Sequence, residues 1–210
     1  MEHRTLIDTD ELARHLTDPN WQIIDVRHNL VDVEAGFAQY VQAHIPGAHF
    51  LHLDRDLSAA KTGSNGRHPL PSAAAFSQKL RRIGIDHGQT IVIYDDAGGM
   101  MAARLWWMLR WCGIFSAAVL NGGWQKWCAE QRPCSADRAP VKPSEFAASG
   151  NRLAWVDVGY VQQHLAHGDM LLLDARSAER FRGENETLDP VGGHIPGARN
   201  HFFQLNLDVL

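Results

Sequence analysis

Cysteine is scarce in this sequence, and the few cysteines form no recognisable motif. The 210 residues contain three, Cys112, Cys128 and Cys134, with no CxxC pair among them. A disulfide-stabilised scaffold and a zinc ribbon are therefore disfavoured, because both need closely spaced cysteines in larger number. A low, odd count is typical of a reducing compartment, so we expect a cytoplasmic protein.

Signals for a membrane or for nucleic acid are also missing. The net charge is −4 and the isoelectric point is about 6.3, which gives no electrostatic reason to expect either partner. The N-terminal residues have no apolar core, so no secretory signal is predicted. The most apolar stretch, residues 102–120, contains Arg104 and Arg110, whose burial in lipid would be costly. A core helix followed by a strand explains it better.

An internal repeat is present instead. The sequence HIPGA occurs at residues 44–48 and again at 194–198, an offset of 150. Upstream, residues 6–27 align without a gap on residues 155–176, at an offset of 149. The identical pairs are Asp8/Asp157, His15/His164, Leu16/Leu165, Asp25/Asp174 and Arg27/Arg176. Two motifs in the same order at nearly the same offset indicate a tandem duplication of one structural unit.

Short apolar segments alternate with helical patterns along the first copy. Residues 21–26, 90–94 and 117–120 are typical of strands, and the segments between them contain helical patterns. Asp8 and Glu11 predict a capping box, and Ser72 predicts the start of a second helix. This alternation favours an α/β fold with a mainly parallel sheet flanked by helices, and we predict that the three strands share one sheet. Ligands of such sheets bind beyond the carboxyl ends of the strands, which directs attention to residues 95–99.

The repeat also predicts the domain boundaries. We expect one domain over residues 1–131, a proline-containing linker over 132–150, and the start of a second domain over 151–210. If the second copy matched the first in length, roughly 70 further residues would be needed, so the second domain is expected to be truncated. Its apolar residues would then lack partners, and self-association through the incomplete domain is possible.

The ordered motifs resemble those of the rhodanese-type sulfurtransferases. Asp-x-Arg at a strand end is followed by HIPGA about twenty residues on, and then by RLWWMLR and LNGGWQKW. The two-domain branch, thiosulfate and 3-mercaptopyruvate sulfurtransferase, is the closer match, over residues 6 to about 203. The resemblance implies transfer of a sulfane sulfur from a small anionic donor to cyanide or a thiol, through a cysteine persulfide. It implies no metal and no organic cofactor.

The sequence departs from the family at the nucleophile. The family's cysteine directly follows the central strand, where this chain has Asp95, and aspartate cannot carry a persulfide. Adding the repeat offset places the second-domain cysteine near position 245, beyond Leu210. We therefore predict that the first domain is non-catalytic, that this chain contains no catalytic residue, and that it is inactive alone. Capping of the following helix by Asp95 or Asp96 is a simpler role than metal binding or acid–base chemistry.

Two arginines of the second copy are candidates for binding the donor. Arg180 lies six residues after Asp174 and matches the family's donor-binding arginine, whereas Val31 stands at the corresponding position of the first copy. Arg176 is the second candidate, although the recurrence of Asp-x-Arg in both copies also fits a structural ion pair. Arg182 and Arg199 would add positive potential.

Other readings of the sequence are weaker. Three histidines invite a metal site, namely His44, His49 and His52, but His44 recurs as His194, and a hydrogen bond stabilising the turn explains that more simply. No metal site is predicted. A phosphatase-like use of the fold needs a cysteine and an arginine around one loop, and residues 95–100 contain neither. The alternative function is a catalytically inactive rhodanese-like binding or regulatory module.

Overall fold

The computed structural model describes residues 5–142, 144–148 and 155–208. The chain divides into two compact units, Met1–Asn151 and Arg152–Leu210, and each is described by itself. Among the described residues, no helix combines the length and the apolar character that crossing a bilayer requires.

The first unit is built on a parallel sheet of five strands in the order β1-β5-β4-β2-β3. The strands are β1 (Leu6–Ile7), β2 (Trp21–Asp25), β3 (Ala48–Phe50), β4 (Thr90–Tyr94) and β5 (Ala117–Leu120). The prediction that three of these segments share one parallel sheet is confirmed, because β4 pairs with β2 on one side and with β5 on the other. Central β4 is the most enclosed of the five, which fits its continuous apolar run.

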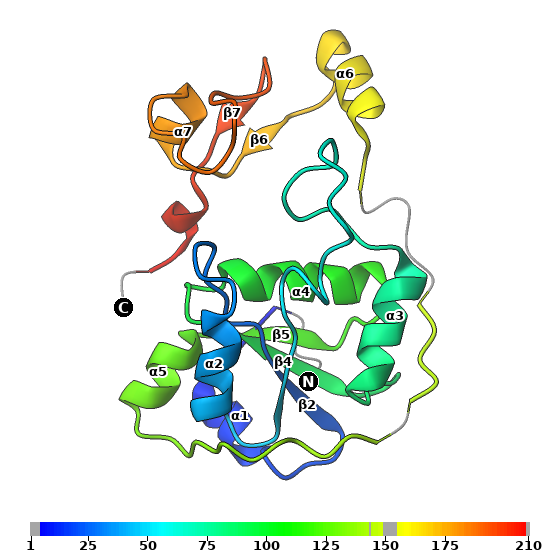
Figure 1. The fold of residues 1–210 in the computed structure, drawn as a ribbon, viewed down its shortest axis with the longest axis vertical. Helices are drawn as coiled ribbons and strands as arrows, with labels where there is room; N and C mark the ends of the chain where they lie inside the picture. The colour runs from blue at the N-terminus through cyan, green and yellow to red at the C-terminus, as the bar shows by residue number, and fades with distance from the viewer. Residues whose placement is uncertain (1–4, 143, 149–154, 209–210) are drawn as a thin grey trace. The chain divides into compact units, whose positions relative to one another are not determined.

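Helices cover both faces of this sheet (Figure 1). They are α1 (Thr9–Arg14), α2 (Ala35–Gln42), α3 (Ala73–Arg82), α4 (Met100–Trp111) and α5 (Gly123–Ala129). Alternate residues of β4 enter two separate cores, since Ile91 and Ile93 join the core of α3 and α4, while Val92 and Tyr94 join that of α1 and α5. The expected α/β architecture, with a mostly parallel sheet and flanking helices, is confirmed.

The segment predicted as a linker, residues 132–150, is part of the first unit over its described length. Ser135 exchanges two backbone hydrogen bonds with His44, at 2.8 and 2.9 Å. Phe146 is 1% exposed in the core that contains α3 and α4. Most described residues of the segment are exposed or half-buried, and the buried ring of Phe146 anchors it. The boundary between the units falls instead at residues 151 and 152.

The second unit is smaller. It contains α6 (Val158–His167), β6 (Leu173–Asp174), α7 (Ala178–Arg182), β7 (Arg199–Asn200) and a 3-10 turn, Phe203–Asn206. Strands β6 and β7 pair in parallel with the same register as β2 and β3, after allowance for the repeat offset. The matching pairs are Ile24↔His49 with Leu173↔Arg199, and Asp25↔Phe50 with Asp174↔Asn200. None of the described residues of this unit is fully buried.

Candidate functional site

The loop at the carboxyl end of β4 closes around the side chain of Asp95. This side chain is 1% exposed, and its two oxygens accept four backbone hydrogen bonds. The donors are the N–H groups of Ala97, Gly99, Met101 and Ala102, at 2.9, 2.9, 2.7 and 2.8 Å. Such a cradle at a helix N-terminus suits one negative charge. The protein's own carboxylate occupies it.

This arrangement confirms that one member of the Asp95–Asp96 pair caps the following helix. Asp95 is that member, and α4 begins at Met100 after Gly99, whose φ of 87° is a conformation that favours glycine. Asp96 stays half-exposed, and its partial burial raises its pKa. The position directly after β4 is therefore filled by a carboxylate that caps α4.

The three cysteines lie away from this loop in the sequence. Cys112 is buried at the end of α4, and burial raises the pKa of its thiol to about 12, so it stays protonated at neutral pH. Cys128 and Cys134 are exposed. The Cys128 thiol has a raised pKa, from partial burial and from neighbouring Cys134. Low thiol pKa marks reactive cysteines, so neither Cys112 nor Cys128 has the environment of a catalytic thiolate.

The Asp-x-Arg motif of the first unit forms a buried ion pair. Arg27 donates from Nε and Nη2 to the carboxylate of Asp25, at 2.9 and 2.7 Å to Oδ2. Its Nη2 also donates to the carbonyl oxygen of Ala43, the residue before HIPGA, at 2.7 Å. The guanidinium lies 4.4 Å from the ring centre of Trp124. The pair therefore ties the end of β2 to the start of the HIPGA turn.

The second unit repeats these contacts. Arg176 donates from Nε to Asp174 Oδ1 at 3.0 Å and from Nη2 to Oδ2 at 2.6 Å. Its Nη2 also donates to the carbonyl of Gly193, again the residue before HIPGA, at 2.6 Å. The ion-pair reading of both motifs is confirmed, and most donors of Arg176 are engaged by its own unit.

The histidine of each HIPGA motif stabilises its own turn. His44 Nδ1 lies 2.7 Å from the carbonyl oxygen of Tyr40 and stacks on that ring. His194 Nδ1 lies 2.7 Å from the carbonyl oxygen of Phe181 and stacks on that ring. Both nitrogens therefore donate, as the simpler reading of the recurring histidine predicts.

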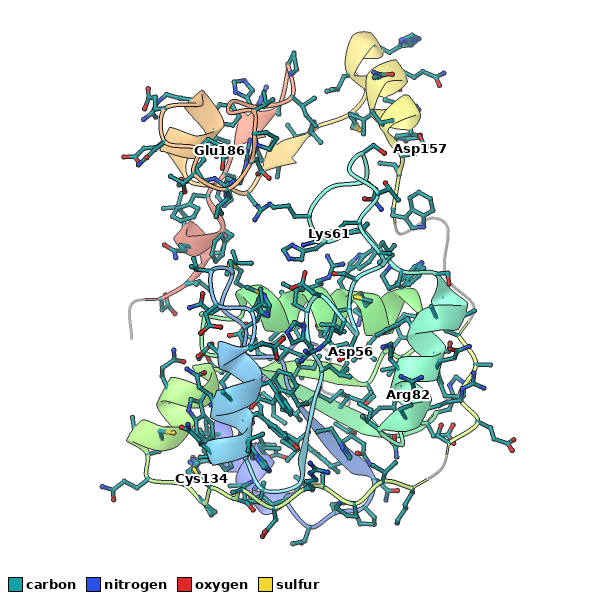
Figure 2. The ribbon with its side chains drawn as sticks, viewed as in Figure 1. Asp56, Lys61, Arg82, Cys134, Asp157 and Glu186 are labelled. Atoms are coloured by element: carbon teal, nitrogen blue, oxygen red, sulfur yellow. The ribbon has the colours of Figure 1, made fainter. Side chains whose placement is uncertain are left out.

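Arg180 is held by two carboxylates. Its Nε and Nη2 donate to the two oxygens of Glu186 at 3.0 Å, and Nη2 also donates to Asp189 at 3.0 Å. Glu186, labelled in Figure 2, also lies 3.6 Å from Nη1 of Arg176, so one carboxylate brings both predicted arginines together. The backbone N–H of Leu188, and after it Arg180, lower the pKa of Glu186 to about 2. Within the described residues, Nη1 of Arg180 donates no hydrogen bond.

Sequence analysis missed a group of side chains beyond the ends of β2 and β3. His28, His52 and Asp54 each offer a ligand atom, and these atoms lie within 4.8 Å of one another. The available signal was the position of each residue shortly after a strand of a parallel sheet, where the strand ends converge.

Comparison with known proteins identifies the family of this chain. The rhodanese-like domain family matches residues 8–130, more than half of its length. This chain belongs to the rhodanese family. It is 39% identical over 209 residues to the "Probable 3-mercaptopyruvate sulfurtransferase" of Pseudomonas aeruginosa, covering 99% of this chain and 74% of that protein.

Other rhodanese relatives agree. The chain is 33% identical over 198 residues to the 3-mercaptopyruvate sulfurtransferase of Escherichia coli K12, with 92% of this chain and 69% of that protein covered. It is 30% identical over 207 residues to the thiosulfate sulfurtransferase of Rattus norvegicus, with 94% and 69% covered. The crystal structure of SseA from Escherichia coli, a 3-mercaptopyruvate sulfotransferase with the rhodanese fold, matches with a TM-score of 0.83 and 33% identity, over 94% of this chain and 74% of that one. These relatives support sulfur transfer as the general activity.

Proposed function

We propose that this rhodanese transfers sulfur from thiosulfate or 3-mercaptopyruvate to a cysteine thiolate, with release of sulfite or pyruvate, and then passes the sulfane sulfur of the resulting persulfide to cyanide or a thiol. The observation that carries the proposal is the identity of 30 to 39% with relatives named for these two donors, over more than nine-tenths of this chain. Both donors are retained because relatives of both names match.

In this proposal the chain holds two rhodanese-like units in tandem, and the first is non-catalytic. The support is chemical, because sulfur transfer needs a thiolate, and the first unit places the carboxylate of Asp95 in the anion cradle instead. The repeated Asp-x-Arg and HIPGA contacts support a second unit of the same kind. No cysteine occurs after Cys134, so we propose that the 210-residue chain has no turnover alone.

Arg180 and Arg176 are the proposed contacts for the anionic group of the donor. Arg180 is the better placed, because Nη1 keeps its N–H groups while Glu186 and Asp189 fix the rest of the guanidinium. A pre-oriented guanidinium suits a carboxylate or a thiosulfate anion, since less side-chain freedom is lost on binding. Arg176 supports this role through the carboxylate of Glu186.

Donor binding tests the proposal without requiring turnover. Calorimetric titration with thiosulfate and with 3-mercaptopyruvate should detect binding that Arg180→Ala weakens about tenfold, the loss expected for one charge-assisted contact. Arg182→Ala is the matched control, because this neighbouring arginine pairs only with Glu184 among the described residues and is half-exposed. Equal loss in both variants would mean that only the net charge matters.

Turnover is the second test. Thiocyanate formation from cyanide should stay at background for the 210-residue chain. Activity above background that disappears in Cys134→Ser would show that the nucleophile is the exposed cysteine and that the assignment of the first unit is wrong.

A binding or regulatory module is the alternative function, and the buried carboxylate of Asp95 is the observation that favours it. A module of this kind would need neither a thiolate nor a donor site. Absence of any Arg180-dependent binding of either donor would favour the module over the sulfurtransferase.

A further inference from the structure

The ends of β2 and β3 bring a set of ligand-type side chains together. The two strands are parallel neighbours, so their carboxyl ends lie at one edge of the sheet. His28 lies three residues after the end of β2, while His52 and Asp54 follow β3 by two and four residues. His68, on the loop between β3 and α3, lies with Nε2 at 3.4 Å from Asp54 Oδ1.

Two of these side chains have buried polar atoms that make no hydrogen bond among the described residues. The side chain of His28 is 1% exposed, and neither of its ring nitrogens has a hydrogen-bond partner among the described residues. Oδ1 of Asp54 is buried and makes no hydrogen bond among the described residues, although Lys61 and His68 each lie 3.4 Å from it. Buried polar groups are almost always hydrogen-bonded, so an imidazole with two unsatisfied nitrogens beside this carboxylate indicates a ligand between them.

We propose that His28, His52 and Asp54 bind a divalent transition-metal ion, with Zn²⁺ as the best match, and that His68 completes the site. Two imidazoles and a carboxylate, with a third imidazole nearby, form a donor set suited to zinc. Neighbouring ligand atoms of tetrahedral zinc lie about 3.3 Å apart. The atoms here lie within 4.8 Å, so modest side-chain rotation would close the site.

His52 has the tautomer that a metal ligand requires. Its Nδ1 faces the backbone N–H groups of Asp54 and Arg55, at 3.1 and 3.4 Å, and must therefore carry the lone pair. Its Nε2 then carries the proton and donates to the carbonyl oxygen of Val33 at 2.9 Å. A backbone carbonyl that fixes the second ring nitrogen is the usual support of a metal-binding histidine. The cation would replace the two long hydrogen bonds at Nδ1.

A competing cation is present at this edge of the sheet, because Nζ of Lys61 lies 3.4 Å from Asp54 Oδ1. Lys61, labelled in Figure 2, is on the loop between β3 and α3 and is largely exposed, so it can leave when a metal ion binds.

Cobalt(II) titration of the full 210-residue chain tests the site, because Co²⁺ takes the same ligands as zinc and absorbs visible light when tetrahedral. Every protein should carry Cys128→Ser and Cys134→Ser, since exposed thiols also bind these ions. We expect one equivalent of Co²⁺ with tetrahedral absorption, displaced by Zn²⁺, and one zinc per chain by elemental analysis after dialysis.

Variants assign the ligands. His28→Asn and Asp54→Asn should each weaken binding at least tenfold, while Lys61→Gln should strengthen it several-fold by removing the competing charge. His87→Asn is the matched control, because His87 is exposed elsewhere in the first unit, and it should bind like the parent.

Two results would overturn the site. One is the absence of stoichiometric binding in the parent. The other is parent-like affinity in Asp54→Asn, which keeps the shape of a side chain whose contacts are mainly with Lys61 and the histidines. Circular dichroism of each variant confirms folding, and Asp54→Asn decides the question if His28→Asn does not fold.

Discussion

Arg27 of the first unit and Arg176 of the second make the same hydrogen bonds to an aspartate and to the residue before HIPGA, yet their side chains are 2% and 29% exposed. The isoleucines of the two HIPGA motifs differ more, because Ile45 is 0% exposed and Ile195 is 53% exposed. The hydrogen-bonded frame of the motif is therefore the same in both units, although its burial differs. Burial of that frame depends on further strands and helices, such as β4, which the first unit places beside β2.

Exchange of amide hydrogens should give the largest difference between the units. Amides of β2 and β4 should exchange on the order of 10³-fold more slowly than those of β6 and β7, because a strand in a buried core opens only with the whole unit. The measurement is hydrogen exchange followed by mass spectrometry of the 210-residue chain.

We also expect the chain to self-associate through the second unit. Exposed apolar side chains of the second unit, Leu171, Leu173, Val191 and Ile195 among them, favour a dimer that light scattering should detect and that cutting near residue 150 should abolish. Slow exchange across the described part of residues 155–203 in a proven monomer would contradict both expectations.

Replacing the arginine of each Asp-x-Arg motif should give the second largest difference, in the loss of unfolding free energy. Arg27→Ala leaves the carboxylate of Asp25 buried without its cation, and we expect a loss of about 3 to 5 kcal/mol in unfolding free energy. Arg176→Ala breaks a partly exposed pair and should cost about 1 kcal/mol or less.

Urea unfolding followed by tryptophan fluorescence reports on the first unit, which holds six of the seven tryptophans. Exchange at β6 and β7 reports on the second unit. Similar losses in the two units would show that burial is not what distinguishes the pairs.

His49 should give the first unit a dependence on pH. It is 7% exposed, whereas Arg199 at the equivalent position of the second unit is exposed. Burial lowers the pKa of His49 below 6.5, so the unfolded chain binds its proton more readily. The contribution of His49 to stability is thus complete above pH 6.5 and is lost as the pH falls through the lower, folded pKa. The Tm of the first unit should fall over this range, and His49→Gln should reduce that fall.

The smallest expected difference concerns the two aspartates. Burial is the largest influence on Asp25 and raises its pKa above 3.8, although Arg27 opposes the change. The side-chain hydrogen bond from Arg176 is the largest influence on Asp174 and lowers its pKa below 3.8. Carboxyl ¹³C NMR titration should therefore place the two values on opposite sides of 3.8. The reverse order would show that the charged partner outweighs desolvation in the buried pair.

Many helix and strand positions could be predicted because their signals lie in the neighbouring sequence. Ser72 caps α3 through the N–H of Ala75, as its position before the helix predicts. Asp8 occupies the N-cap position of α1 as predicted, but the capping box does not form. The carboxylate of Asp8 accepts instead from Asn121 of the loop after β5, and Glu11 contacts Arg14 and His15. A partner more than a hundred residues away leaves no local signal.

Contacts without a local sequence signal also explain the other differences between prediction and structure. The segment over residues 132–148 has the composition of a linker, and the burial of Phe146 depends on a core assembled from α3 and α4. The pairing of Arg180 with Glu186 was not predicted, because the loop that brings Glu186 back to α7 follows no periodic pattern. His28 and Asp54 meet only because β2 and β3 are neighbours.

The carboxylate of Asp95 is a ligand covalently attached to its own binding site. Attachment gives it an effective concentration that exceeds millimolar when the connection is short, so free anions at lower concentration cannot displace it. The cradle of the first unit is thereby closed to free anions below that concentration. In Asp95→Ala the cradle would be open, and the stability of the first unit should rise with added formate, because an anion that binds only the folded state stabilises it by mass action.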